Sequence, residues 1–310
     1  MGFTCITPVE VTPATSDAWT DVDVSASVPA GATGAIIHYN RGTGGTGEGI
    51  GLRKNGSTDN RTNVIWWAHG WAMVGLDANR VFEAYLGNAT VEDLWLVGYV
   101  DSAATFSDNA VDKSLTGTGA WTDIDCSANA PGAIGLIFEV IGSGATHIFG
   151  IRPNGSTDNR QAQVSTHNWV IVGCDAGQIV EGIIDNLNLD FFLVGYITAG
   201  ATFLTDGVAK SIGSTGAYVD VDCSASAPSA TGLFFHVWSS AAGNRQYALR
   251  KNDSTEDIYT YDDKHRWAMV ECDTGQIVEM KISNLEVDLF LIGYTTAAAG
   301  VTFVPRLMVV

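Results

Sequence analysis

Histidine, aspartate and glutamate recur three times at fixed spacing along this 310-residue chain, each time with an arginine upstream. Such side chains can ligate zinc or act as general acid and base. Three catalytic sites in tandem would be unusual, however, and each aspartate precedes residues that favour a hairpin turn. We therefore expect structural polar contacts, with each glutamate paired to its arginine. The sets are Arg53, His69, Asp77 and Glu83; Arg152, His167, Asp175 and Glu181; and Arg250, His265, Asp273 and Glu279.

Cysteine appears in pairs at matching positions. Two positions both carry cysteine in the second and third sets, whereas both carry aliphatic residues in the first. Strand alternation turns these side chains inward, so we expect each pair to be in contact, either as a disulfide or as buried free thiols that pack like small hydrophobes. The remaining Cys5 is either free or bridges two chains. The candidate disulfides are Cys126–Cys174 and Cys223–Cys272, and the aliphatic residues are Val24 and Leu76.

Other chemistry-bearing patterns are weak. Pairs of aspartates two residues apart on one strand face can hold calcium, but such a face is more often solvated. The sequence contains no nucleophile elbow, phosphate-binding loop or paired Cys-x-x-Cys motif. We therefore expect no enzymatic activity, no cofactor and no bound metal. The aspartate pairs are Asp21 and Asp23, Asp123 and Asp125, and Asp220 and Asp222.

All of these residues belong to an internal repeat of about a hundred residues, long enough to fold as a domain. Four sequence blocks return in the same order three times. We place the units at 1–106, 107–203 and 204–310, the last with an apolar tail at 304–310. The blocks are 19–25, 121–127 and 218–224; 53–59, 152–158 and 250–256; 71–74, 169–172 and 267–270; and 96–99, 193–196 and 291–294.

Within each unit the pattern is that of an all-β protein. Short apolar segments rich in β-branched residues are separated by Gly, Asn or Pro, and no segment has the periodicity of a long amphipathic helix. The sequence therefore predicts three tandem antiparallel β-sandwich domains, jelly-roll-like in character. In the second unit the expected strands lie near 110–116, 120–127, 133–141, 146–152, 161–174, 178–185 and 190–198.

Charge and hydropathy exclude several classes of partner. The formal net charge of −18 is spread over all three units, which argues against nucleic acid because phosphate contacts need clustered Lys and Arg. No segment reaches the roughly 20 apolar residues of a membrane-spanning helix. The first residues lack the basic and apolar regions of a secretory signal, so we expect no signal peptide.

Four tryptophans do not recur as tryptophan in the other copies. Aromatic side chains that only one copy carries are candidates for contacts specific to that unit, with a glycan or with another subunit, although ordinary packing also explains them. These candidate contact residues are Trp66, Trp67, Trp95 and Trp238.

Three of the repeated blocks carry a resemblance. The segment 53–61, the His-x-Trp motif and the Leu-Val-Gly-Tyr block at 96–99 resemble tandem β-sandwich structural proteins of tailed phages and uncultured viruses. The resemblance implies a virion component: a capsid decoration protein, a head fibre or a tail-associated protein. Its partners would be other virion proteins or copies of itself, and it would be assembled in the host cytoplasm and released by lysis.

Two further expectations concern function and assembly. The alternative function is a multivalent carbohydrate-binding module or host-recognition adhesin, because tandem copies multiply weak affinities for surface glycans. Short linkers allow a closed ring or a string of units, and we expect a string. The tail at 304–310 is expected to dock on another chain or on the first unit.

Overall fold

The protein is all-β, as the sequence predicts. The computed structural model describes residues 2–41, 48–64, 69–142, 147–164, 167–239, 245–262 and 265–296. Every strand pair in these ranges is antiparallel. The described residues contain no helix that is long and apolar enough to cross a membrane. Trp66, Trp67 and the tail at 304–310 lie outside the described residues.

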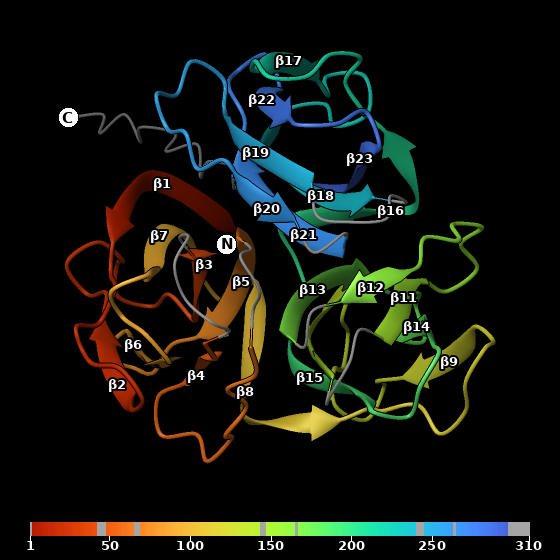
Figure 1. Ribbon diagram of the computed structural model, residues 1–310. Helices are drawn as coiled ribbons and strands as arrows, with labels where there is room; N and C mark the ends of the chain where they lie inside the picture. The colour runs from red at the N-terminus through yellow and green to blue at the C-terminus, as the bar shows by residue number, and fades with distance from the viewer. Residues whose placement is uncertain are drawn as a thin grey trace, which may run out of the picture.

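The first unit is a sandwich of two sheets (Figure 1). One sheet has the order β1-β7-β3-β5 and the other has the order β2-β6-β4. The strands are β1 (Phe3–Glu10), β2 (Trp19–Asp23), β3 (Gly34–Arg41), β4 (Ile50–Lys54), β5 (His69–Gly75), β6 (Val81–Leu86) and β7 (Glu92–Val100).

The second and third units repeat this arrangement and extend the second sheet by one short strand, β12 or β20. The second unit contains β8 (Ala104–Asp112), β9 (Thr122–Asp125), β10 (Gly135–Gly142), β11 (His147–Pro153), β12 (Ala162–Val164), β13 (His167–Gly173), β14 (Ile179–Ile184) and β15 (Leu189–Ile197). The third contains β16 (Ala201–Ala209), β17 (Val219–Asp222), β18 (Ala230–Ser239), β19 (Arg245–Lys251), β20 (Thr260–Asp262), β21 (His265–Glu271), β22 (Ile277–Ile282) and β23 (Val287–Thr296).

The burial pattern along each strand reflects what covers its two faces. In β6 and β7 buried and partly exposed residues alternate, as expected where one face packs on the core and the other meets water. In β5 and β13 every residue is buried. These strands are therefore covered on both faces, by their own sandwich on one side and by neighbouring units on the other.

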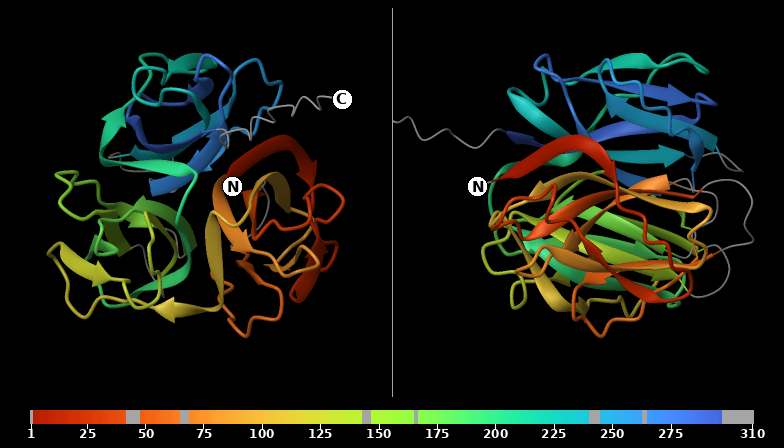
Figure 2. Two further views of the ribbon diagram at one scale, coloured as in Figure 1. Left: turned by 180° about the vertical axis from the view of Figure 1, so that it is seen from behind. Right: turned by 90° about the vertical axis from the view of Figure 1, so that its left-hand side faces the viewer.

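The three sandwiches close into a ring about a pseudo-threefold axis (Figures 1 and 2). Strands β5, β13 and β21 lie nearest the axis and contact one another. Our expectation of a string of units is therefore wrong, because the strands that would be solvated in a string are apolar on both faces. A small cavity of ≈ 20 Å³ remains between them, and the side chains around it include Trp71, Met73, Trp169, Ile171, Trp267 and Met269.

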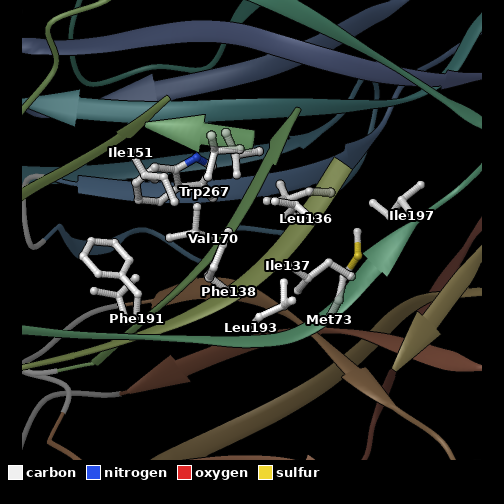
Figure 3. Close-up of a cluster of buried hydrophobic side chains, with 14 of the residues drawn as sticks. Met73, Leu136, Ile137, Phe138, Ile151, Val170, Phe191, Leu193, Ile197 and Trp267 are labelled. Atoms are coloured by element: carbon white, nitrogen blue, oxygen red, sulfur yellow. The ribbon is translucent and has the colours of Figure 1, made fainter. Parts of the chain in front are cut away.

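Each unit inserts one tryptophan side chain into the hydrophobic core of a neighbouring unit. Trp71 of the first unit packs in the hydrophobic core of the third, and Trp169 of the second unit packs in the core of the first. Trp267 of the third unit completes the core of the second, where Figure 3 shows it beside Ile151. Each sheet is built from one repeat, so the sandwiches are separate, but no core is complete without a neighbour's side chain.

The unit boundaries lie a few residues before the predicted ones. Strand β8 begins at Ala104 and pairs with β15 of the second unit, and β16 begins at Ala201 and pairs with β23 of the third. Boundaries at 106 and 203 would cut both strands. The boundary is hard to place from sequence because the aromatic side chain of each strand, Phe106 or Phe203, packs against the preceding unit.

Candidate functional site

The recurring aspartates stabilise hairpin turns. In the second unit, Asp175 Oδ1 accepts hydrogen bonds from the backbone N–H groups of Gly177 at 2.8 Å and Ile179 at 2.9 Å. Its Oδ2 accepts one from Asn154 Nδ2 at 2.7 Å. The bonds from Ile179 and Asn154 lower the pKa of Asp175. The contacts of Asp77 and Asp273 match these, so the turn interpretation is confirmed.

The recurring arginines and glutamates form the expected ion pairs. The Nε–Oε2 distance is 2.9 Å for Arg53–Glu83, 2.9 Å for Arg152–Glu181 and 2.8 Å for Arg250–Glu279. Each pair joins neighbouring strands of one sheet, which places opposite charges directly across from each other.

An aromatic ring covers the arginine of each pair. The guanidinium carbon lies 4.0 Å from the ring centroid of Trp19, 4.1 Å from that of Trp121 and 3.5 Å from that of Tyr218. The two indoles donate hydrogen bonds to Asn60 and Asn159 at 2.9 and 3.1 Å. These rings are partly exposed beside β2, β9 and β17, at the outer rim of the ring (Figure 1). We call each aromatic–arginine–glutamate group a rim stack.

The aromatic residue of the rim stack and the residue packed beneath it change together between copies. Trp19 and Trp121 lie against Gly51 and Gly150, where a Cβ would collide with the indole. In the third unit Ala248 takes the glycine's place, and the smaller Tyr218 takes that of tryptophan. Sequence reasoning recorded this recurrent aromatic as part of a repeat block but assigned it no role.

The recurring histidines are buried between units. His69 Nε2 lies 3.0 Å from the carbonyl oxygen of Tyr247 in the third unit, and His265 lies with its ring centroid 4.6 Å from that of Phe149 in the second. His167 Nε2 contacts Glu139 at 2.7 Å. Burial lowers the pKa of His69 and of His265 to about 3. These two imidazoles are therefore neutral structural groups near pH 7.

Two interface arginines were missed by the sequence analysis. Arg61 of the first unit bonds the carboxylate of Glu139 in the second and stacks 4.6 Å from the centroid of Phe192. Arg160 of the second unit donates to His236 Nδ1 in the third at 3.1 Å. They escaped notice because the third copy carries a different residue at this position.

Glu139→Gln should lower the free energy of unfolding by roughly 1.5–3 kcal/mol, the range for a buried hydrogen bond to a charged group. Only 1% of the Glu139 side chain is exposed, and it bonds both Arg61 and His167. Equilibrium urea denaturation measures the loss. Replacing Arg61 as well should cost less than the sum of the single changes, and strictly additive losses would contradict direct coupling.

All five cysteines are free thiols, so the two candidate disulfides are not formed. Cys174 Sγ donates to the carbonyl oxygen of Ala133 at 3.3 Å, and Cys272 Sγ donates to that of Ala230 at 3.3 Å. Burial raises the pKa of both to about 12, with smaller contributions from the partner thiol and, for Cys174, from Asp175. The pairs act as packing contacts, which the aliphatic residues of the first unit provide equally well.

The remaining candidates have different surroundings. Trp238 donates its indole N–H to the carbonyl oxygen of Gln161, which joins the third unit to the second at 3.2 Å. Trp95 has Phe192 and Phe290 as its equivalents, so this aromatic position is shared after all. The paired aspartates are exposed, and within the described ranges no group of three or more His, Cys, Asp or Glu side chains could hold a metal.

Comparisons with known proteins give little further information. No family model matches the chain, and no curated protein matches it. Among solved structures, the N-terminal CBM22-1–CBM22-2 tandem domain of Paenibacillus barcinonensis Xyn10C matches at 11% sequence identity and a TM-score of 0.15. That match covers 64% of this chain and 94% of the other. At this level of similarity it carries no argument about function.

Proposed function

We propose that this chain is a non-enzymatic structural protein that acts through protein–protein contacts, as a capsid decoration, head-fibre or tail-associated component of a virion. The observation that supports this most is that its recurring polar residues take part in structural contacts. The arginines, aspartates and glutamates that recur hold turns and sheets together, and the histidines fill the interfaces of a closed ring.

A ring of three fused units suits such a role for physical reasons. Fusion removes the association cost that three free chains would bear. It also lets the outer faces of the three units differ in sequence. One molecule can then contact three different neighbours around its pseudo-threefold axis.

The test is to locate the chain in purified particles. Virus particles from lysates that contain the gene are banded on a density gradient and analysed by mass spectrometry, and antibody-labelled particles are imaged by electron microscopy. We expect the chain to co-sediment with the particles at a fixed stoichiometry. Recovery only in the soluble fraction at the top of the gradient would contradict the proposal.

A second function, multivalent glycan binding, is favoured by the rim stacks. Each copy presents a partly exposed aromatic ring with an arginine and a glutamate at an equivalent position, and aromatic surfaces are common sugar-binding elements. Three equivalent sites on one body would bind a surface glycan with avidity.

A glycan array separates the two functions. Binding that weakens stepwise as Trp19, Trp121 and Tyr218 are replaced by alanine, but is unchanged in the surface control Leu187→Ala, would establish the glycan function. Leu187 is 57% exposed and is not a member of any rim stack. No binding to any glycan would leave the structural role as the sole proposal.

A further inference from the structure

The interface between the first and second units shows how neighbouring sandwiches lock together. Phe106 of β8 lies so close to the backbone of Gly34 and Gly75 that neither position has room for a Cβ. Beside it, Asn109 Oδ1 accepts a hydrogen bond from Ser57 Oγ at 2.9 Å. An aromatic plug and a polar cap therefore come from the same strand.

The interface between the second and third units repeats this lock. Phe203 of β16 lies against Gly135 and Gly173, and Asp206 Oδ1 accepts a hydrogen bond from Ser156 Oγ at 2.9 Å.

A backbone bond completes the lock at both places. The N–H of Ala110 donates to Asp59 Oδ2 at 2.8 Å, and the N–H of Gly207 donates to Asp158 Oδ2 at 2.8 Å. Arg61 and Arg160 then bond the same two aspartates.

At the interface between the third and first units, the closing interface, the described residues lack the aromatic plug, the backbone donor and the arginine of this lock. Cys5 occupies the position of Phe106 and Phe203, since each is the last residue to pair before the register shifts. Pro8 stands directly before pairing resumes, where the other strands carry the donating N–H, and proline has none. Ile258 replaces the interface arginine.

A pocket of ≈ 310 Å³, the closing pocket, lies at this interface. Its apolar lining includes Trp71, Leu249 and Met269, and Cys5 lies among them. Glu256, which corresponds to Asp59 and Asp158, lies at its polar side. Arg250 and Lys251 also line the pocket, but their side chains are paired with Glu279 and Glu271. The space is therefore suited to an apolar side chain together with a further positive charge beside Glu256.

The chain itself carries such a segment after the third unit. In the first two linkers, Thr-Phe follows the closing tyrosine of the unit, with Phe106 seven residues after Tyr99 and Phe203 seven residues after Tyr196. After the third unit, Thr-Phe returns with Phe303 nine residues after Tyr294. The tail thus begins like the first strand of another repeat, with Phe303 in the place of the aromatic plug.

We propose that the closing pocket binds the C-terminal segment 297–310 of the same chain, with Phe303 as the plug that Cys5 fails to supply. The route is short. Strand β23 ends at Thr296, and Thr295 Oγ1 lies 3.5 Å from the carbonyl oxygen of Gly232, whose α-carbon faces Cys5 Sγ. Seven residues from Thr296 to Phe303 reach up to about 23 Å when extended.

Charge complementarity supports the same occupant. Glu256 lacks the arginine two residues later that Asp59 and Asp158 have. Burial raises the pKa of its carboxyl, and a hydrogen bond from Ser254 and the charge of Arg250 offset this only in part. Arg306 is the one charged residue of segment 297–310. With Phe303 in the pocket, Arg306 is three residues further on and within reach of this carboxylate.

Cys5 is a built-in reporter of pocket occupancy. In the full-length chain we expect a maleimide to modify Cys5 slowly, and Phe303→Ala to accelerate the reaction about tenfold because the protecting side chain is gone. Val309→Ala is the matched control and should leave the rate unchanged. Peptide mapping by mass spectrometry separates Cys5 from the four cysteines of the cores. Equal rates in the parent and F303A would overturn the proposal.

A cross-link identifies whose tail is bound. In F303C, mild oxidation with oxidised glutathione should join the new thiol to Cys5 within one chain, giving a monomer on a non-reducing gel, whereas V309C should not cross-link. Cross-linked dimers would show that the tail of a second copy fills the pocket and would overturn the same-chain assignment. Absence of any link to Cys5 in F303C would refute docking of this segment altogether.

Discussion

Acidification from about pH 7.5 to about pH 5 should lower the free energy of unfolding by roughly 4 kcal/mol through two buried histidines alone. The pKa of His69 and of His265 is about 3 in the folded protein because both rings are buried. In the unfolded chain each returns to about 6.5. Burial also lowers the pKa of His38 and His236 well below that value, which adds to the loss.

The direction follows from where protons bind. Below about pH 6.5 the histidines of the unfolded chain bind protons, whereas the buried imidazoles of the folded chain bind them only near about pH 3. The histidine contribution to the free energy of unfolding is therefore fully present above about pH 6.5 and declines as the pH falls below it. Carboxylates such as Asp175, whose pKa is lowered, lose their contribution only at more acidic pH. Urea denaturation across the window measures the slope.

His69→Gln is the control for this effect. Glutamine can still donate to the carbonyl oxygen of Tyr247 but does not titrate, so the loss between about pH 7.5 and about pH 5 should shrink by roughly 2 kcal/mol. Stability that stays constant over this window in the parent chain would contradict the assignment of neutral, buried histidines.

Local spacing made the sandwich and its polar contacts predictable. The Arg152–Glu181 pair and the Asp175 turn depend on residues a short way apart in one sheet, and the repeat displayed each of them three times. In the second unit, strands such as β10, β14 and β15 lie within a residue or two of the ranges expected from alternation and turn residues.

Ring closure was not predictable from the same signals. A strand buried on both faces, such as β13, has no alternation to reveal what covers its second face. Arg61 and Glu139 meet across 78 positions and two units, and neither recurs as the same residue in all copies. The joint presence or absence of each cysteine pair indicated that the two side chains are close, but the sequence does not show whether they form a disulfide or a packing contact.

Trp169→Ala should lower the free energy of unfolding by roughly 3–5 kcal/mol, the cost of truncating a large buried aromatic side chain. Trp169 belongs to the second unit by sequence, but it lies in the core of the first with its ring centroid 5.1 Å from that of Tyr39. The cavity left behind would open inside a unit other than the one that carries the substitution.

This exchange also determines how the molecule unfolds. Because Trp71, Trp169 and Trp267 each complete a neighbouring core, loss of one sandwich removes a core side chain from the next. Calorimetry of the parent chain should therefore show one cooperative transition, which Trp169→Ala shifts as a whole to lower temperature. The exposed control Leu187→Ala should change stability by less than about 0.5 kcal/mol. Three resolved transitions in the parent, or a Trp169→Ala effect confined to the second unit, would show that the sandwiches are independent despite their shared cores.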